Sequence, residues 1–266
     1  MTGALSDLTP LDLETDPKGC CARLYESDAV RWLLDDQLHP GGERLSLRLA
    51  QLAGVAPGWR VVDVACGSGA TALLLARELG CVTVGVDLGA HAIAETRDAE
   101  RPGERASFLL GDAEALPLPD GGFDVALSEC SLCTFPDKPR AIAEMVRVVR
   151  PGGTIAIADV TADLAALPGA LRTAAARVAC VADARSADEY VALLRDAGCE
   201  PLAIERHDDD LRAMADRVEA RLRVARMLAP PGDQRDRIRE AAALARLAIN
   251  AIAHGSLGYA LITARV

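Results

Sequence analysis

Short apolar runs alternate with segments of helically spaced apolar residues through the middle of the chain. Runs such as residues 154–158 are typical of buried strands, and the spaced segments are typical of amphipathic helices. Strands that alternate with helices predict a parallel sheet with helices on both faces, which is an α/β fold. The predicted strands are 60–65, 82–86, 106–110, 123–127 and 154–158, and the predicted helices between them are 70–79, 90–99 and 138–149.

Both ends of the chain have mainly helical patterns, although residues 1–18 are acidic, aperiodic and contain two prolines, which indicates a loose arm. We expect residues 1–56 to form this arm and a helical lid. Residues 57–266 are expected to form one domain with a helical insertion around residues 208–255. The remaining predicted elements are helices over 21–36, 43–52, 164–182, 187–197, 211–225 and 238–252, a strand over 202–205, and a strand over 257–266 that closes the sheet.

The charge balance argues against several classes of partner. The chain has 29 Lys and Arg residues and 39 Asp and Glu residues, which gives a net charge of −10. The sequence contains no run of basic residues, so binding to nucleic acid is not expected. No apolar stretch reaches the roughly 18 residues that cross a bilayer, and the acidic N-terminus lacks the apolar core of a signal peptide. We therefore expect no membrane partner and a cytoplasmic protein whose eight cysteines are reduced.

The sharpest local pattern is a strand that runs into a glycine turn at the start of a helix. Gly67 and Gly69 in this turn let a ligand approach the backbone, and the following helix offers free N–H groups. Asp87 ends the next strand, 20 residues after Gly67, where a carboxylate can accept both hydroxyls of a ribose. On its own, this pattern also fits a dinucleotide-binding fold.

Acidic residues at two other strands favour a ligand without phosphates. Asp63 lies inside the first strand, four residues before Gly67, where it is placed to meet an ammonium group rather than a pyrophosphate. Asp112 follows the third strand and suits an adenine amino group. These positions together indicate a ligand that has a cation, a ribose and an adenine.

With Phe123-Asp124-Val125 and Arg150-Pro151-Gly152-Gly153, these motifs resemble the class I S-adenosylmethionine-dependent methyltransferases over roughly residues 58–160. The resemblance implies a Rossmann-like, seven-stranded methyltransferase sheet whose last strand is antiparallel, with S-adenosyl-L-methionine as cofactor. It also implies a role for each matched residue: Asp63, Ala65, Gly67 and Gly69 face the methionine part, Asp87 and Leu88 hold the ribose, Asp112 and Ala113 flank the adenine, and Glu129 with Cys130 lines the methyl-transfer face.

Cysteines occur in each segment that is expected to form the acceptor pocket: the N-terminal helices, the loop after the fourth strand and the helices after the fifth. This arrangement loosely resembles the arsenite methyltransferases, in which thiolates hold trivalent arsenic beside the cofactor. On that resemblance Cys180 is one thiolate and Cys20 or Cys21 is the other, with Cys130 and Cys133 in the central loop. Thiolates suit As(III) because it is soft, and its lone pair is then the nucleophile.

The cysteines also have a structural interpretation. Free cysteine is often a buried packing residue, which we expect for Cys66, Cys81 and Cys199 and which applies equally to the rest. A zinc site at Cys130 and Cys133 would need four ligands, and no second cysteine pair has that spacing, so no metal is expected.

Three further residues are weaker candidates. His39, before Pro40, either reaches the cofactor carboxylate, acts as a base or caps a helix, and Tyr25 either covers the cofactor or packs on a helix. His207 and the three aspartates after it suggest either a hard-metal site or a helix start whose acids favour the N-terminal dipole. No other residue is recognisable as a general base, which favours a nucleophile that needs none.

We therefore predict methyl transfer from S-adenosylmethionine to a small molecule, with a thiolate-bound trivalent metalloid such as arsenite as the first candidate acceptor. One alternative is a C-, O- or N-methyltransferase of a natural-product-like metabolite. Another is a non-catalytic cofactor-binding protein with an interaction role. The apolar stripes on the last two helices are also compatible with a homodimer.

Overall fold

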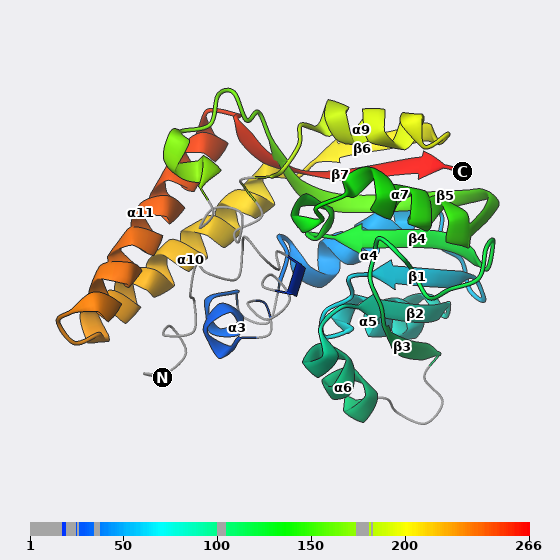
Figure 1. Ribbon diagram of the computed structural model, residues 1–266, viewed down its shortest axis with the longest axis horizontal. Helices are drawn as coiled ribbons and strands as arrows, with labels where there is room; N and C mark the ends of the chain where they lie inside the picture. Colours follow the sequence, from blue (N-terminus) through cyan, green and yellow to red (C-terminus); the bar gives the residue numbers. More distant parts are fainter. Residues whose placement is uncertain are drawn as a thin grey trace.

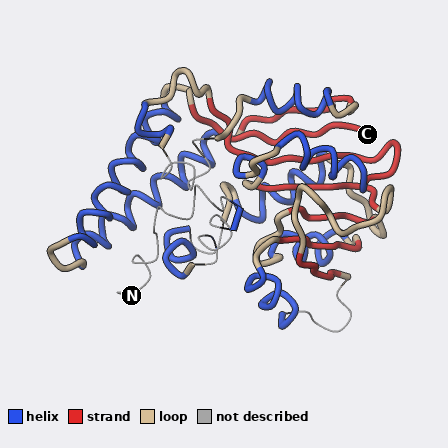
Figure 2. The backbone as a smooth tube through the Cα atoms, viewed as in Figure 1, coloured by secondary structure: helices blue, strands red, loops and turns tan. Residues whose placement is uncertain are grey.

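The computed structural model describes residues 18, 19, 25, 27–34, 38–99, 105–173, 181 and 183–266. Within them, one twisted sheet carries helices on both faces, and a pair of long helices extends away from one end of the sheet (Figures 1 and 2). Because helices cover both faces of the sheet, a ligand can reach the interior only at the ends of the strands.

The sheet has seven strands in the order β3-β2-β1-β4-β5-β7-β6. The first five strands pair in parallel, and β7 runs antiparallel between β5 and β6. This arrangement confirms the α/β fold with a closing antiparallel strand. The strands are β1 Arg60–Val64, β2 Val82–Asp87, β3 Ala106–Leu110, β4 Phe123–Glu129, β5 Val149–Ala162, β6 Glu200–Arg206 and β7 Leu257–Arg265.

The helices pack against the two faces of the sheet, and each face has an apolar core of its own. One core combines the central strands with α4, α5, α10 and α11, and the other combines the opposite faces of the same strands with α7 and α9. The helices are α3 Asp28–Leu34, α4 Gly42–Leu52, α5 Ala70–Leu79, α6 Ala90–Ala99, α7 Lys138–Val148, α9 Ala187–Asp196, α10 Asp208–Leu228 and α11 Asp233–Ala253, with short 3₁₀ helices at Leu132–Thr134 and Gly169–Arg172.

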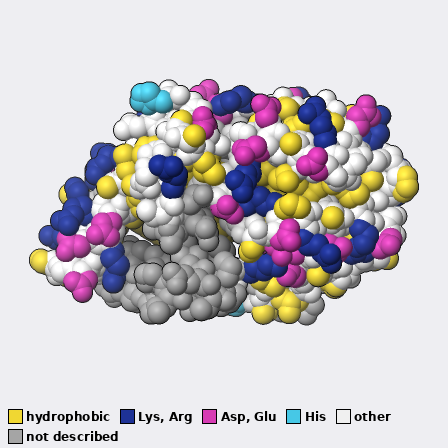
Figure 3. All heavy atoms as spheres, turned by 45° about the horizontal axis from the view of Figure 1, so that its top comes forward, with side chains coloured by type: hydrophobic (Ala, Val, Ile, Leu, Met, Phe, Trp, Pro, Cys, Tyr) yellow, Lys and Arg dark blue, Asp and Glu magenta, His cyan; other side chains and the backbone are white. Residues whose placement is uncertain are grey.

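The two long helices α10 and α11 occupy the predicted insertion between β6 and β7 (Figure 1). They form a hairpin with a small apolar core of its own around Leu222 and Ile238. On the face drawn in Figure 3, basic and acidic side chains are interspersed over the described surface. No helix among the described residues is long and apolar enough to cross a membrane.

The predicted helix over 164–182 is wrong at its beginning. The carboxylate of Asp163 accepts the N–H groups of Ala165 and Ala166, so this stretch forms a turn rather than a helix. Pro168 then precedes the short 3₁₀ helix Gly169–Arg172 and cannot donate a helical hydrogen bond. Residues 174–180 and 182 lie outside the described part of the chain.

The chain leaves the sheet centre in opposite directions after β1 and after β4, because β2 and β3 lie on one side and β5 on the other. Ligands of open parallel sheets bind at such a switch point, beyond the carboxyl ends of the strands. Two non-glycine residues have left-handed backbone there: Ala65, just after β1, with φ 61°, and Cys130, just after β4, with φ 51°. Strained backbone of this kind concentrates at functional sites.

The stability losses caused by alanine at Gly69 and at Gly54 can be compared to measure how tightly the glycine loop is packed. The φ values of the two glycines are +74° and +73°, but a Cβ on Gly69 would lie 2.4 Å from Phe108 Cε1, whereas described residues leave the space at Gly54 open. We expect Gly54→Ala to lose only about 1–2 kcal/mol for its left-handed conformation. Gly69→Ala is expected to lose about 1–3 kcal/mol more from overpacking. Urea unfolding measures both losses, and equal losses would show that Phe108 does not limit the loop.

Candidate active site

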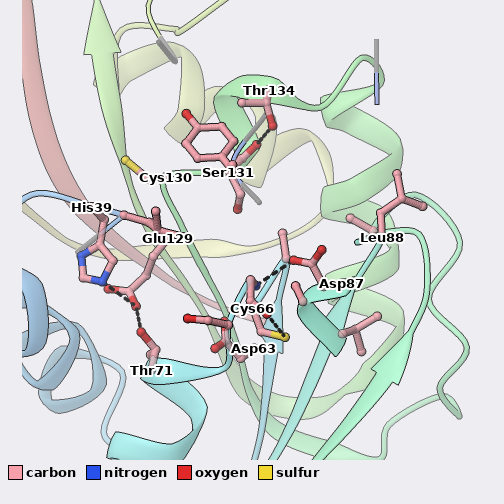
Figure 4. A pocket seen from close by; sticks show the side chains of 18 of the residues that line it. His39, Asp63, Cys66, Thr71, Asp87, Leu88, Glu129, Cys130, Ser131 and Thr134 are labelled. Carbon is pink, nitrogen blue, oxygen red and sulfur yellow. Dashed lines mark hydrogen bonds and ion pairs between the residues drawn. The ribbon is translucent and has the colours of Figure 1, made fainter. Parts of the chain in front are cut away.

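A cavity of about 380 Å³ opens at the carboxyl ends of β1, β2 and β4. Figure 4 shows its wall, with Asp63, Asp87 and Glu129 coming from three neighbouring strands. Residues before the sheet complete the wall, among them Lys18, Arg31 and His39. The cavity therefore combines strand ends with the N-terminal segment.

The carboxylate of Asp87 fixes the glycine loop. Its Oδ2 accepts the N–H of Gly67 at 2.7 Å, and its Oδ1 accepts the N–H of Gly89 at 2.7 Å. The N–H groups of Ala65 and Cys66 both donate to the carbonyl of Val86, at 2.8 and 3.1 Å. The turns after β1 and β2 are thus held together, and Asp87 is presented to the cavity (Figure 4).

Asp63 lies in the cavity wall with an unsatisfied oxygen. The residue is 3% exposed, and its Oδ2 has no hydrogen-bond partner among the described residues. Burial raises the pKa of this carboxyl well above its usual value, and the negative charges of Glu129 and Asp87 raise it further. The position therefore requires either a proton or a cationic ligand.

Glu129 is the centre of a hydrogen-bond network that joins β4 to two helices. Ser46 of α4 donates to the carboxylate at 3.1 Å, and Thr71 of α5 donates to its Oε2 at 2.7 Å. His39 Nε2 lies 3.9 Å from the same oxygen, and its Nδ1 lies 3.2 Å from the carbonyl oxygen of Pro40. Both ring nitrogens therefore face oxygen acceptors, which does not favour His39 as a general base.

Asp112 lies at the end of the cavity opposite Glu129. Its Oδ1 accepts the N–H of Glu114 at 2.9 Å, and its Oδ2 pairs with Lys18 Nζ at 2.8 Å. Lys18 also pairs with the carboxylate of Glu114 at 2.5 Å. The N-terminal segment is thereby connected to the loop after β3, where the sequence predicts contact with an adenine.

The structure separates the cysteines predicted for the acceptor pocket. Cys130 lines the cavity, whereas Cys133 is 1% exposed in the apolar core and does not line it. Cys20, Cys21 and Cys180 lie outside the described residues, so their role stays a prediction.

The remaining cysteines are Cys66, Cys81 and Cys199. Cys81 and Cys199 are buried, as expected for packing residues, but Cys66 also lines the cavity beside Asp63. Burial, and then the charges of Asp63 and Asp87, raise the pKa of the Cys66 thiol far above its usual value. A neutral thiol of this kind is a poor nucleophile.

The predicted cofactor residues converge on the cavity with one exception. Gly69 does not line it, and a Cβ at this glycine would meet the ring of Phe108. The role of each of these residues stays a prediction. Those that line the cavity are Asp63, Ala65, Gly67, Asp87, Leu88, Asp112, Ala113 and Glu129.

Sequence reasoning missed Ser46, Thr71, Lys18 and Arg31. Ser46 could have been found, because it is a polar residue on the apolar face of a helix, next to the buried Leu45. The other three become site residues only through contacts far along the chain.

Of the three weaker candidates, His39 and Tyr25 line the cavity, whereas His207 does not. His207 precedes α10, whose first turn contains Asp208–Asp210, and the described residues contain no cluster suited to a metal ion.

The residues of the cavity fit S-adenosylmethionine. An ammonium group would supply the donor and the charge that Asp63 Oδ2 lacks. Asp87 is held by two backbone N–H groups, and a carboxylate is the kind of acceptor that ribose hydroxyls bind. The chemistry of the donor set therefore agrees with a ligand that combines a cation with a nucleoside.

Comparisons with known proteins agree with this interpretation of the motifs. Residues 62–157 match the family model described as a methyltransferase domain. Methyltransferase GfsG of Streptomyces halstedii is 35% identical over 179 residues, which cover 64% of this chain and 63% of that protein. An arsenite methyltransferase of Halobacterium salinarum is 30% identical over 210 residues, covering 76% of this chain and 52% of that protein.

A third relative is the 27-O-demethylrifamycin SV methyltransferase of Amycolatopsis mediterranei, 34% identical over 169 residues that cover 61% of either protein. The chain thus spans between about half and two thirds of the length of these curated relatives. Among solved structures, the [4+2]-cyclase SpnF superposes with a TM-score of 0.73 and 25% identity, covering 93% of this chain and 95% of that one.

Asp63 is expected to make stability depend on pH. Because its pKa is raised in the folded chain, the folded state binds this proton more tightly than the unfolded state does. Stability is therefore lost as pH rises above the unfolded carboxyl pKa of about 4. We expect Asp63→Asn to be more stable than the parent at about pH 8 and to gain nothing at about pH 4.

Urea unfolding at both pH values measures this difference. Asp120→Asn is the control, because that side chain is 80% exposed and its substitution is expected to give no pH-dependent gain. A loss of stability in Asp63→Asn that is the same at both pH values would contradict the prediction.

Proposed function

We propose that this chain, which belongs to the class I S-adenosylmethionine-dependent methyltransferases, transfers a methyl group from S-adenosylmethionine to a small, largely apolar organic molecule. The observation that carries the proposal is the convergence of Asp63, Asp87, Asp112 and Glu129 on one cavity. Each comes from a different strand end, and each stands where the family motifs predict an acidic residue or a cofactor contact.

The residues of the cavity would hold the cofactor along its length. Asp63 would accept its ammonium group, Asp87 its ribose hydroxyls and Asp112 its adenine amino group. The bound cofactor supplies an electrophilic methyl group, so the protein needs mainly to align the acceptor with it and to exclude water. Tyr25 and Leu38 of the N-terminal segment line the cavity and would help to exclude water.

An organic acceptor is favoured by the part of the wall that follows β4. Cys130, Ser131, Thr134 and Phe135 line the cavity there, and they provide an apolar surface with two hydroxyl groups. No second described cysteine accompanies Cys130 on this part of the wall. Two of the relatives are named as methyltransferases, and the name of the Amycolatopsis mediterranei protein includes an organic acceptor.

Arsenite is the second candidate acceptor. The observation that favours it is the similarity to an arsenite methyltransferase over 210 residues. This candidate depends on Cys180 and on Cys20 or Cys21, and the acceptor experiment below includes it for that reason.

A ring-forming reaction without methyl transfer is a further candidate. It is favoured by the likeness to a [4+2]-cyclase, which extends over 93% of this chain at 25% identity. Because ring formation does not require methyl transfer, cofactor binding and methyl transfer are tested separately.

Asp87→Asn tests the cofactor site. The substitution keeps the size of the side chain but removes its charge and one of the two oxygens that accept the N–H groups of Gly67 and Gly89. Affinity for S-adenosylmethionine is therefore expected to fall about 10- to 100-fold. Isothermal titration calorimetry measures the change. Asp120→Asn, at an exposed position, is expected to bind like the parent. Equal affinity in the two variants, or no binding by the parent, would contradict the cofactor assignment.

Labelled methyl transfer tests the acceptor. We expect product from apolar hydroxylated or aromatic acceptors, at equal rates in the parent and in Cys180→Ser, because the proposed acceptor needs no thiolate. Product from arsenite with glutathione that is lost in Cys180→Ser and kept in Cys199→Ser would replace the organic acceptor with arsenite. Cofactor binding without product from any acceptor would favour the non-transferring candidates.

A further inference from the structure

The hairpin of α10 and α11 exposes apolar side chains at its tip, residues 221–240, which stands clear of the sheet (Figure 1). Val224, Met227 and Leu228 are 50%, 75% and 72% exposed. Their spacing of three and four residues places them on one face of α10. Leu222, on the other side of this helix, packs with Ile238 in the core of the hairpin. The exposed apolar side chains therefore lie outside the packing that holds the hairpin together.

The tip is basic although the whole chain is acidic. Residues 221–240 contain six arginines and three acidic residues, whereas the net charge of the chain is −10. Arg226 and Arg237 form no ion pair with any described residue. Because α10 has 21 residues, the tip is about 30 Å, or about three Debye lengths, from the acidic first turn of this helix. A partner at the tip therefore meets positive charge.

Trp32 of α3 extends this surface. Its side chain is 40% exposed, and the guanidinium of Arg221 lies 5.9 Å from the centre of its ring and donates to its carbonyl oxygen. Tryptophan favours the boundary between lipid and water, because its ring is apolar and its N–H can still reach water. Exposed apolar side chains, arginines and a tryptophan thus meet at one end of the molecule.

We propose that the tip and Trp32 form a docking surface for a lipid bilayer that contains anionic lipids. The arginines attract the headgroups, while Met227 and Leu228 insert at the boundary with the acyl chains. This contact needs no spanning helix, and it differs from the sequence-based expectation of no membrane partner, which rested on the lack of a spanning segment. It does not depend on the proposed function, because neither the tip nor Trp32 lines the cavity.

A bilayer fits this surface better than a second copy of the chain. A stable protein interface buries about 800 Å² on each partner, whereas the exposed apolar side chains of the tip occupy only the last two turns of α10. A symmetric contact between two tips would also bring like charges together. A bilayer can surround a narrow tip, and its anionic headgroups supply the opposite charge.

Sedimentation of the whole chain with lipid vesicles tests the inference. One set of vesicles is phosphatidylcholine alone, and the other is equal parts phosphatidylcholine and phosphatidylglycerol. We expect the chain to bind the anionic vesicles about tenfold or more tightly than the neutral ones. Added salt is expected to weaken this binding, because it screens exposed charges.

Two variants of the tip are compared with matched controls. Met227→Ser combined with Leu228→Ser is expected to weaken binding to anionic vesicles about tenfold or more. Arg237→Glu is expected to weaken it about 5- to 30-fold. The controls are exposed residues of β6 and β7, Leu202→Ser combined with Ile204→Ser and Arg265→Glu, which are expected to bind like the parent. Thermal unfolding of each variant checks that it is folded.

Fluorescence gives a second readout, because the chain has two tryptophans. In Trp59→Phe the remaining tryptophan is Trp32, and its emission is expected to shift to shorter wavelength with anionic vesicles and to stay unchanged with neutral ones.

Equal or absent binding to the two kinds of vesicle would overturn the inference, and so would binding that survives both tip variants or that leaves the emission of Trp32 unchanged. A dimer of the parent that is lost in the Met227→Ser, Leu228→Ser variant would overturn it in favour of a second copy. Failure of the parent to bind S-adenosylmethionine would instead contradict the proposed function and leave this inference standing.

Discussion

The hydrogen bond from the N–H of Gly67 to the carboxylate of Asp87 joins the turns after the two strands that form one side of the cavity. A glycine loop without such an acceptor would leave backbone donors unsatisfied at a partly buried strand end. Because Asp87 also accepts from Gly89, one side chain fixes both turns. The position of Asp63 behind the loop and the opening of the cavity above it both depend on this arrangement.

The buried carboxylate of Asp63, in the wall of the cavity, is unfavourable for folding. Asp63 has an oxygen without a partner among the described residues, and its neighbours Glu129 and Asp87 repel its charge. An amide side chain at this position would make the empty chain more stable at neutral pH. A bound cation would offset the cost of burying Asp63, so this residue is stronger evidence for a cationic ligand than the glycine loop alone.

The segment before the sheet is part of the site although it lies outside the matched methyltransferase domain, residues 62–157. Lys18 contacts the loop after β3, Arg31 contacts α6, and Ser46 contacts the end of β4. The domain thus supplies the strand ends, and the preceding residues supply much of the remaining wall. Differences in acceptor among related proteins can arise from such segments without any change in the sheet.

The sequence by itself determined the sheet, the glycine loop and the acidic residues at the strand ends. These features follow from local periodicity and from short spacings, which act within one strand–turn–helix unit.

Only the tertiary structure decided which distant residues meet. Ser46 and Thr71 reach Glu129 from 83 and 58 residues away along the chain, and local patterns carry no information about such contacts. The structure also placed Gly69 close to the ring of Phe108, placed Cys133 in the core and put a turn at the beginning of the helix predicted after Asp163. Phe108 and the apolar core lie far along the chain from Gly69 and Cys133, so local patterns could not show these contacts. The turn at Asp163, by contrast, is a local interaction, since the carboxylate accepts N–H groups two and three residues further on. Side-chain chemistry fixes what a residue can do, and packing fixes what it contacts.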